Sequence, residues 1–375
     1  MRVLQVVSLV SPQGEYGGPT RVALAQCRAL RDAGHDVVLA AGSWGYDPVP
    51  REVDGVRVRL FHAVAPMPGS FYGLASPGLV SFVARAGATA DAVHVHLARD
   101  LVTLPAALAT HLRRRPYVLQ THGMVIPSRN PLAGPLDLTM TRRVLRGAGR
   151  VYYLTDAERE SLQEVATPLR LEHLRNGIDL PPRTPLPSLT GAAPRVLFLA
   201  RVQARKRPLD FVEMAVRLAP RHPGVRFRMV GPDEGLGEEV RAAIARSGLG
   251  DRLVWDGPLP PDQTAAAMRA ADIYVLPSVD EPYPMSVLEA MSLGRPVVVT
   301  NSCGLAPIIA RRSAGAVAPE GPAGVAHAVD RLLSDPVLRE QAGAHARDAI
   351  RVELGMEAVV AQLEHTYRDV TTRTS

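Results

Sequence analysis

Apolar strand signals alternate with amphipathic helix signals along the whole chain, and this alternation starts twice. Near-continuous apolar strands separated by helices are typical of parallel sheets that are covered by helices on both faces. The alternation therefore predicts two doubly wound α/β domains with a cleft between them, and ligands that bind outside the carboxyl ends of the strands. The expected strands are 3–9, 36–41, 56–61, 92–96, 117–121 and 150–153, then 195–200, 225–230, 253–255, 273–276 and 296–300. The expected helices are 19–34, 101–114, 136–145, 156–165, 208–218, 237–247, 262–270, 287–293, 324–333, 336–352 and 357–370.

A proline-rich connector separates the two runs. From Asp179 to Pro187 the chain reads DLPPRTPLP, and four prolines fall within seven residues. Such a segment forms a semi-rigid, extended linker and not a helix or a strand. A length of 375 residues also exceeds that of one ordinary domain. We therefore place the first domain at 1–182 and the second at 183–355.

The composition excludes several classes of protein. Hydrophobic residues make up 46% of the chain and charged residues 21%, as in folded and not disordered proteins. Cys27 and Cys303 are the two cysteines, which excludes a disulfide scaffold and a cysteine-rich zinc site and suits a reducing compartment. No apolar run reaches about 18 residues, so we expect no membrane-spanning helix. The apolar start of the chain is too short for a signal peptide, and we expect a cytoplasmic protein.

The net charge of +6 is concentrated in the first half of the chain. Residues 1–183 contain 21 Arg and 15 acidic residues, whereas residues 184–375 contain 22 of each sign. An acidic partner, such as a phosphate, a nucleic acid or an anionic lipid, explains such an excess. Composition alone also explains it, because 42 of the 43 basic residues are Arg and Lys206 is the one lysine.

A glycine pair precedes the first expected helix. The segment Gly14–Thr20 reads GEYGGPT and follows the first strand. Glycines at this place let a ligand approach the helix N-terminus, where unpaired N–H groups and the helix dipole favour anions. The segment lacks the GxGxxG spacing and the later acidic residue of a dinucleotide site. Gly17 and Gly18 are therefore candidate anion contacts, and a purely structural turn is the alternative.

Four cations follow the first strand of the second half. Arg201, Arg205, Lys206 and Arg207 lie within seven residues, directly before an expected helix. Guanidinium and ammonium groups at the end of a strand suit a diphosphate that is bound without a metal. A solvated turn is the alternative, and the position of the single lysine here favours the functional interpretation.

The most informative segment runs from Leu276 to Met291. Pro282 and Pro284 prevent Glu281 from lying in a helix, so Glu281 is expected in a loop and the helix begins near Met285. The first-turn amides of that helix then face a ligand, and Glu289 follows one turn later. A carboxylate, amides that attract anions and a second carboxylate suit a ligand with hydroxyls at both ends and a phosphate between them.

Histidines in the first half supply a further candidate. His122 ends an expected strand beside Gly123, which is a favourable place for a ligand contact. His94 and His96 share one face of a strand, but no third ligand has suitable spacing, and we interpret them as structural. The chain contains neither a DxD motif for a metal-bound diphosphate nor the GxSxG of a serine hydrolase.

Together these segments resemble the retaining glycosyltransferases of family 4 with the GT-B fold. The resemblance rests on GGPTRV at 17–22 with LRDAGHDV at 30–37, RNGID at 175–179, Arg201 with Lys206, and the E-x7-E signature from Glu281 to Glu289 followed by AMSLGRPVV at 290–298. It covers nearly the whole chain. It implies a first domain that binds the acceptor, a second domain that binds a nucleotide sugar, and a terminal helix, about 356–375, that packs back on the first domain.

The resemblance also implies a role for each matching residue. Glu281 would accept hydrogen bonds from hydroxyls of the donor sugar, and Glu289 would bind the ribose hydroxyls. Arg201 and Lys206 would bind the diphosphate and stabilise its growing charge. His122 would lie over the donor sugar near the reacting carbon. The remaining donor contacts would come from Gly17, Gly18, Pro258, Leu259, Met285, Ser286 and Val287.

The chain departs from the family pattern at several positions. The usual E-G-F-G reads EPYP at 281–284, which removes two backbone N–H donors and alters the loop around the donor sugar. Ala200 and Arg207 stand where the family commonly has glycine. The carboxylate of Glu281 is retained, so we expect the donor site to be retained with altered sugar contacts.

The expected reaction transfers a sugar from a UDP- or GDP-sugar to a hydroxyl of a lipid-linked or soluble acceptor. The α configuration of the sugar carbon would be retained. We expect neither a metal cofactor nor a nucleic-acid partner. The pathway would be that of a cell-surface polysaccharide, a glycolipid or a natural product. The arginine clusters 113–115 and 142–150 suit peripheral contact with an anionic membrane. A GT-B epimerase or hydrolase and a non-enzymatic two-domain sugar binder are the alternatives.

Overall fold

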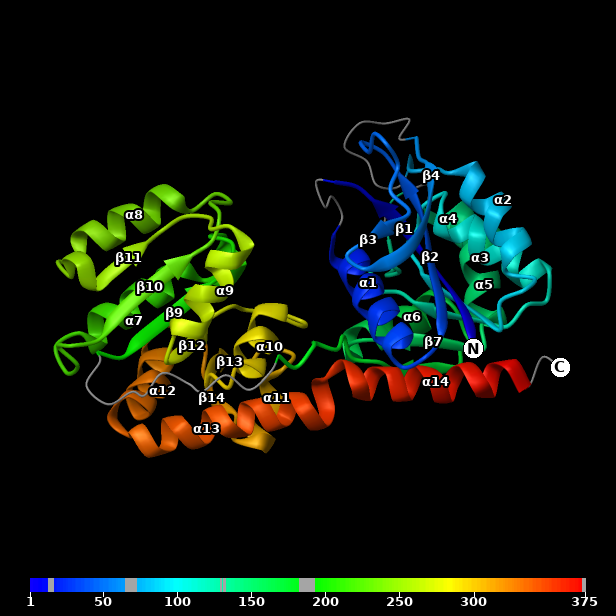
Figure 1. The fold of residues 1–375 in the computed structure, drawn as a ribbon. Helices are drawn as coiled ribbons and strands as arrows, with labels where there is room; N and C mark the ends of the chain where they lie inside the picture. Colours follow the sequence, from blue (N-terminus) through cyan, green and yellow to red (C-terminus); the bar gives the residue numbers. More distant parts are fainter. Residues whose placement is uncertain (13–16, 65–72, 129, 131–132, 182–192, 373–375) are drawn as a thin grey trace. The chain divides into compact units, whose positions relative to one another are not determined.

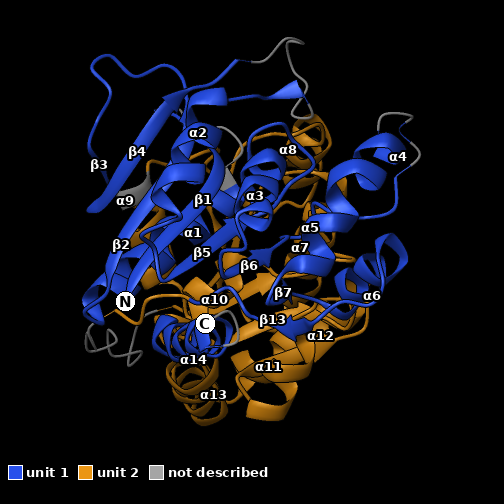
Figure 2. Cartoon of the chain, turned by 90° about the vertical axis from the view of Figure 1, so that its right-hand side faces the viewer, with its two compact units in different colours: residues 1–177, 356–375 blue, residues 178–355 orange. Residues whose placement is uncertain are grey.

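The computed structural model describes residues 1–12, 17–64, 73–128, 130, 133–181 and 193–372 (Figure 1). The chain divides into two compact units, coloured separately in Figure 2: unit 1 comprises Met1–Gly177 with Met356–Ser375, and unit 2 comprises Ile178–Gly355. The boundary after Gly177 thus lies five residues before the expected boundary after residue 182. Most of the predicted connector, residues 182–187, lies outside the described residues.

Unit 1 is built on an eight-stranded sheet with the strand order β3-β4-β2-β1-β5-β6-β7-β8. Its pairs are parallel apart from β3 and β4, which form an antiparallel pair. The strands are β1 (Arg2–Val10), β2 (Asp36–Ser43), β3 (Glu52–Val53), β4 (Val56–His62), β5 (Ala92–His96), β6 (Tyr117–Gln120), β7 (Arg150–Tyr153) and β8 (Leu171–His173). The central strands β1, β5 and β6 are buried along nearly their whole length, which explains their continuous apolar sequences.

Helices cover this sheet. They are α1 (Gly17–Asp32), α2 (Pro77–Ala86), α3 (Thr103–Leu112), α4 (Ala133–Leu136), α5 (Arg142–Gly147), α6 (Asp156–Val165) and α14 (Met356–Thr372). The last of these, α14, packs against α1 (Figure 1), and its Leu363 and Tyr367 are buried in the same apolar cluster as Leu30. The helix α1 ends as its sequence predicts, because Gly34 has a φ of +88° and its N–H donates to the carbonyl of Arg31.

Unit 2 is built on a six-stranded parallel sheet with the order β11-β10-β9-β12-β13-β14. Its strands are β9 (Arg195–Leu199), β10 (Arg226–Val230), β11 (Leu253–Trp255), β12 (Ile273–Leu276), β13 (Val297–Thr300) and β14 (Gly315–Ala318). Its helices are α7 (Pro208–Leu218), α8 (Gly237–Arg246), α9 (Pro261–Ala270), α10 (Met285–Ser292), α11 (Ala306–Arg312), α12 (Pro322–Ser334) and α13 (Pro336–Ala349). Numbered from β9, this order is 3-2-1-4-5-6, which is the doubly wound order of nucleotide-binding folds.

The prediction of two doubly wound α/β units is confirmed, and several elements differ in detail. Residues 136–145 form no single helix, because a π-helical turn (Asp137–Thr141) lies between α4 and α5. The hydroxyls of Thr139 and Thr141 there donate to carbonyls four and five residues earlier. The sequence analysis missed α2, α11, β3, β8 and β14. Most of these elements are short, and β14, for example, consists of the four residues GAVA, which are too few to show a periodic pattern. No helix in the described ranges is long and apolar enough to cross a membrane.

Candidate active site

In unit 2, the predicted donor residues follow the two strands at which the strand order reverses. The reversal lies between β9 and β12, which are neighbours in the sheet. Helices leave adjacent strands in opposite directions at such a point, and the loops after the two strands diverge to leave room for a ligand. Arg201 and Lys206 follow β9, and Glu281 follows β12. The topology therefore brings two motifs together that lie 75 residues apart in the chain.

Lys206 and Glu281 form a buried ion pair. The Nζ of Lys206 lies 2.5 Å from Oε2 of Glu281, and both residues are at least nine-tenths buried. The guanidinium of Arg205 also lies 3.4 Å from the same carboxylate oxygen, but its side chain is half exposed. A buried charge is costly without a partner, so each of the two residues compensates the buried charge of the other.

The local backbone explains how Lys206 becomes buried. After β9 the chain makes one 3-10 turn (Ala204–Lys206), and Arg207 then adopts a left-handed conformation with a φ of +51°. Pro208 starts α7 directly afterwards, because proline is well suited to the first turn of a helix. This sharp reversal leaves Lys206 buried between the exposed side chains of Arg205 and Arg207.

The loop that contains Glu281 is fixed at several points. The N–H of Val279 donates to the carbonyl of Arg205 at 3.0 Å, which ties this loop to the loop after β9. The N–H of Gly304 donates to the carbonyl of Glu281 at 2.8 Å. A Cβ at position 304 would overlap the carbonyl oxygen of Pro282, so glycine is required for this close approach. Asp280 has a φ of +49°, a conformation that non-glycine residues adopt rarely and mostly at functional sites.

Arg201 does not join this ion pair. Its side chain is 54% exposed, and its Nη1 donates to both carboxylate oxygens of Glu234 at 3.0 and 3.1 Å. The two residues predicted to bind the diphosphate therefore have different acidic partners: Arg201 pairs with Glu234, and Lys206 pairs with Glu281. An exposed ion pair of this kind contributes little to stability and can exchange its carboxylate for a phosphate.

The helix α10 begins at Met285, as the prolines predicted. Met285 is partly exposed, Val287 is buried in the core, and the side chain of Glu289 is on the exposed face of the helix. The expectation of three available first-turn amides is wrong for Val287. Its N–H donates to the carbonyl of Pro284 at 3.1 Å and so closes the first turn on itself.

Ser286 is held by a tyrosine that sequence reasoning did not single out. The hydroxyl of Tyr274 lies 2.9 Å from the carbonyl of Leu199 and 2.7 Å from Oγ of Ser286. A phenol has one proton and a carbonyl can only accept, so Tyr274 donates to Leu199 and the Ser286 hydroxyl donates to Tyr274. Burial raises the pKa of Tyr274, which keeps this proton in place. The lone pairs of Ser286 are then available to accept from a ligand hydroxyl.

Pro258 and Leu259, the predicted base contacts, lie between β11 and α9. Pro258 is exposed, and Leu259 packs partly on the core of unit 2. The start of this segment is fixed to β10, because Gly231 donates its N–H to the carbonyl of Gly257 and accepts from the indole of Trp255 at 3.0 Å. An exposed apolar segment whose start is held in place suits stacking against a planar ring.

In unit 1, Gly17 and Gly18 form the first turn of α1, after β1. A Cβ added at Gly18 would meet no heavy atom within 4 Å, and the φ of this residue is not in the left-handed region. Nothing in the described fold of unit 1 therefore requires glycine at position 18. The absence of a side chain there is explained more simply by a ligand than by packing.

His122 follows β6 at the end of a column of three stacked histidines. The ring centroids of His94 and His96 are 4.7 Å apart, and those of His96 and His122 are 5.0 Å apart. Burial is the main cause that lowers the pKa values of all three, to about 3 for His94 and His122 and well below the ordinary value for His96. The three rings are therefore uncharged at neutral pH. His94 donates to or accepts from the hydroxyl of Tyr367 at 2.7 Å, in keeping with its predicted structural role.

Hydrogen bonds extend along this column. The side-chain amide of Gln5 lies 3.0 Å from Nε2 of His96, and Nδ1 of His96 lies 2.7 Å from Nε2 of His122. A neutral imidazole has one N–H and one lone pair, so His122 shares one ring nitrogen with His96 and has the other for a ligand. It can form a hydrogen bond with a ligand hydroxyl but cannot supply a positive charge.

A buried glutamate holds the turn that carries His122. Oε1 of Glu158, on α6, accepts from the hydroxyl of Thr121 and from the N–H of Gly123, both at 2.5 Å. His122 itself has a φ of +50°, so its backbone conformation depends on these neighbours. Sequence reasoning found His122, interpreted His96 as structural, and missed Glu158 and Gln5. These three lie on other elements, and no local signal links them to His122.

Comparison with known proteins agrees with this arrangement. Residues 17–177 match the glycosyl transferase 4-like domain, and residues 189–349 match the glycosyl transferases group 1. A 2-deoxystreptamine glucosyltransferase of Streptomyces kanamyceticus is 29% identical over 352 residues, which cover 84% of this chain and 89% of the relative. A D-inositol 3-phosphate glycosyltransferase of Frankia alni is 30% identical over 308 residues, with 74% of each chain covered.

Solved structures show the same fold. Anabaena Alr3699/HepE, solved in complex with UDP, superimposes with a TM-score of 0.74 at 18% identity and covers 98% of this chain and 100% of its own. A glycosyltransferase from Rickettsia africae superimposes with a TM-score of 0.73 at 17% identity, with 98% of each chain covered. The predicted fold and family are thus confirmed: the chain belongs to the family 4-type glycosyltransferases with the GT-B fold, and it is a glycosyltransferase.

Proposed function

We propose that this glycosyltransferase takes its sugar from a nucleoside diphosphate sugar and that unit 2 binds this donor. The observation that carries the proposal is the buried contact between Lys206 and Glu281 at the point where the strand order of unit 2 reverses. A cation beside a hydrogen-bond acceptor suits the junction of a phosphate and a sugar. Exposed Arg201 and the first turn of α10 add positive charge after the same two strands.

The proposed chemistry is stabilisation of a departing diphosphate. Negative charge grows on the diphosphate as the bond to the sugar breaks, and Lys206 and Arg201 are fixed cations that can meet it. Without a DxD motif in the chain, we assign to these cations the role that a bound metal has in other transferases. Glu281 would then exchange part of its contact with Lys206 for hydroxyls of the sugar.

We further propose that the reaction retains the α configuration, with the acceptor attacking from the face that the diphosphate leaves. In this scheme a departing phosphate oxygen takes the acceptor proton. The neutral state of His122 supports this assignment, because a ring with a lowered pKa can orient a hydroxyl but is a poor proton donor to a leaving group.

The relatives point to cyclitol hydroxyls as acceptors. The names of several relatives specify 2-deoxystreptamine or D-inositol 3-phosphate, and those of the UDP and UDP-glucose complexes specify a uridine nucleotide. We therefore place UDP-sugars and soluble cyclitols first among the candidates. GDP-sugars remain in the panel that follows.

A panel of nucleotide sugars, scored by thermal stabilisation with EDTA present, tests the donor. A ligand that binds the folded state at 100 times its Kd adds about 2.7 kcal/mol to the free energy of unfolding, so the matching donor should raise Tm by several degrees. Turnover with 2-deoxystreptamine and D-inositol 3-phosphate, followed by NMR of the anomeric proton, then gives the acceptor and the stereochemistry. Stabilisation by no UDP-, GDP-, ADP- or TDP-sugar, or only with a divalent ion, contradicts the proposal. Donor turnover at full rate without an acceptor indicates a hydrolase or an epimerase instead.

Gly18→Ala separates a binding role from a structural one. Among the described residues the added methyl meets nothing within 4 Å, and alanine has the higher helix propensity, so we expect the free energy of unfolding to stay equal or to rise by up to about 1 kcal/mol. If a ligand approaches the backbone here, kcat/KM should nevertheless fall at least tenfold. Paired chemical denaturation and kinetics measure both. Unchanged kinetics would show that Gly18 contacts no substrate.

A further inference from the structure

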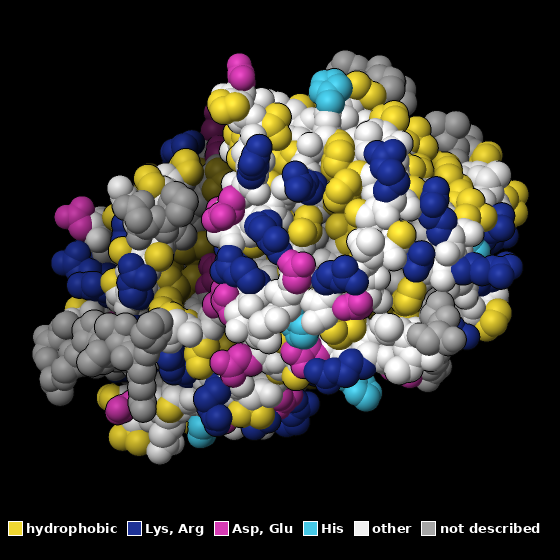
Figure 3. Space-filling view, turned by 45° about the vertical axis from the view of Figure 1, so that its right-hand side comes forward, with side chains coloured by type: hydrophobic (Ala, Val, Ile, Leu, Met, Phe, Trp, Pro, Cys, Tyr) yellow, Lys and Arg dark blue, Asp and Glu magenta, His cyan; other side chains and the backbone are white. Residues whose placement is uncertain are grey.

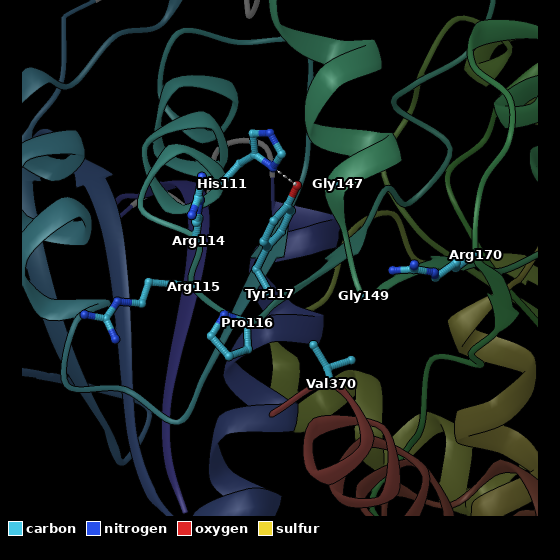
Figure 4. Close-up of a pocket in the computed structure, with 9 residues that line it drawn as sticks. All are labelled: His111, Arg114, Arg115, Pro116, Tyr117, Gly147, Gly149, Arg170 and Val370. Atoms are coloured by element: carbon cyan, nitrogen blue, oxygen red, sulfur yellow. Dashed lines mark hydrogen bonds between the residues drawn. The ribbon is translucent and has the colours of Figure 1, made fainter. Parts of the chain in front are cut away.

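A basic pocket lies on unit 1, at the amino ends of β6 and β7. It has a volume of about 280 Å³ and is lined by His111, Arg114, Arg115, Pro116, Tyr117, Gly147, Gly149, Arg170 and Val370 (Figure 4). These residues come from the end of α3, the segments that lead into β6 and β7, the segment before β8, and α14. Figure 4 shows Arg114 beside His111 on one side and Arg170 extending toward Gly149 from the other.

The pocket is separate from the residues assigned to the reaction. His122 follows the carboxyl end of β6, whereas Tyr117 begins that strand at its amino end. Four strand residues span about 10 Å, and the two ends face opposite edges of the sheet. Ligands of doubly wound folds bind at the carboxyl edge, so the fold itself gives no reason for a ligand site at this edge.

The charge of the pocket is uncompensated. No acidic residue lines it, and no described acidic side chain forms an ion pair with Arg114, Arg115 or Arg170. A second hollow shares His111 and Gly147 with it and is lined by Arg142, Arg143 and Arg146 as well as Leu138. In Figure 3, Lys and Arg side chains are spread over the face turned to the viewer, with Asp and Glu side chains among them. Like charges at this density repel one another, and an anion between them would remove that repulsion.

Part of the pocket wall is closely packed. Tyr117 donates its hydroxyl to the carbonyl of Val144 at 2.7 Å. A Cβ at Gly147 would overlap the ring of His111, and one at Gly149 would overlap Val370, so both glycines are needed for this close packing. In the neighbouring hollow, the Nε groups of Arg142 and Arg146 donate to the carbonyls of Val165 and Thr167.

Arg114 occupies a position that favours glycine or asparagine. It follows the C-terminus of α3 with a φ of +54°, where its N–H donates to the carbonyl of His111 at 2.9 Å. The left-handed conformation is unfavourable for an arginine, and helices usually end on glycine or asparagine there. Arginine at this place is thus unfavourable for the helix end and is explained by the charge that it places in the pocket.

We propose that this pocket binds a phosphate monoester group. Guanidinium groups that approach from more than one side match the several oxygens of a tetrahedral dianion better than the two oxygens of a carboxylate. The same chemistry is present in a free phosphate, in a soluble phosphorylated metabolite and in the headgroup of phosphatidic acid. The site is independent of the donor-binding role of unit 2.

Titration calorimetry of the full chain with inorganic phosphate at low ionic strength tests the proposal. The wild type should bind phosphate, and Arg114→Asn and Arg170→Gln should each weaken binding about tenfold or more, because each removes a charge-assisted contact. Asparagine suits the left-handed conformation, so the first variant keeps the helix end intact. If it fails to fold, Arg114→Gly provides the same test. Arg113→Gln is the matched control, since Arg113 is the exposed neighbour that does not line the pocket, and it should change affinity less than twofold.

Two further arms identify the site and the source. Arg201→Gln should leave unchanged the phosphate binding that Arg114→Asn weakens, which separates this pocket from the donor site. Vesicles with phosphatidic acid, compared with vesicles of phosphatidylcholine, should sediment the wild type but not Arg114→Asn if the phosphate belongs to a lipid. Binding of inorganic phosphate without sedimentation identifies a soluble ligand. If neither probe binds, or if binding is lost in Arg201→Gln and kept in Arg114→Asn, the proposal is overturned.

Discussion

Lys206→Met is expected to lower kcat/KM by two to three orders of magnitude. Removing one preorganised donor from a developing anion typically costs about 3 kcal/mol in the barrier, and Lys206 is the buried cation of the proposed diphosphate site. Methionine has a similar length and no charge, so packing is largely kept. Steady-state kinetics with the donor identified in the panel measures the effect.

The same substitution should also destabilise unit 2, and this effect must be separated from the kinetic one. It leaves the carboxylate of Glu281 buried with only half-exposed Arg205 as a partner, at 3.4 Å. Breaking a fully buried pair costs 3–5 kcal/mol, and the remaining arginine reduces the expected loss to about 2 kcal/mol. In the double variant Lys206→Met with Glu281→Gln, the unpaired charge is removed, so stability should largely return while activity stays low.

Arg205→Gln is the matched control for Lys206. It removes the neighbouring cation, which is exposed and more distant from Glu281, and we expect an activity loss below tenfold. Two results would refute the assignment of the diphosphate site. One is that Lys206→Met keeps wild-type kcat/KM, and the other is that the double variant regains activity together with stability.

Acidification between pH 7 and pH 5 is expected to lower the free energy of unfolding through His94 and His96, with about 2 kcal/mol of the loss from His94. Both are fully buried, and burial lowers the pKa of His94 to about 3 and that of His96 well below its ordinary value. In the unfolded chain both titrate near pH 6.5, so below that pH the unfolded state binds more protons than the folded state. The stability is therefore present above about pH 6.5 and is lost as the pH falls toward the folded values.

Urea unfolding at several pH values measures this dependence. His94→Gln keeps a hydrogen-bonding group near Tyr367 but removes one titrating ring, so the slope of the unfolding free energy against pH should fall by one proton. His345→Gln, at an exposed histidine, is the matched control substitution. A slope in His94→Gln equal to that of the wild type would show that folding does not lower the pKa of His94.

Much of the fold could be predicted because its signals are local. The apolar strands of both sheets and the glycine that ends α1 can each be recognised from a few consecutive residues. Pro282 and Pro284 likewise set the start of α10. The E-x7-E segment and the cluster from Arg201 to Arg207 identified the region of the donor site for the same reason. The π-helical turn before α5 and the short strand β14 could not be predicted, because threonine hydroxyls and neighbouring strands decide them, not intrinsic propensity.

Local sequence signals were sufficient to predict the two α/β units, the family and the candidates for the donor site. The partners of those candidates became visible only in the folded chain. Lys206 pairs with Glu281 and Arg201 with Glu234, the amide of Val287 is used within its own turn, and His122 lies at the end of a histidine column whose burial keeps its ring neutral. Folding also gathered the arginines of the phosphate pocket from segments that are far apart in the chain. Periodicity and turn chemistry depend on neighbours in sequence, whereas partners, burial and therefore charge state depend on neighbours in space.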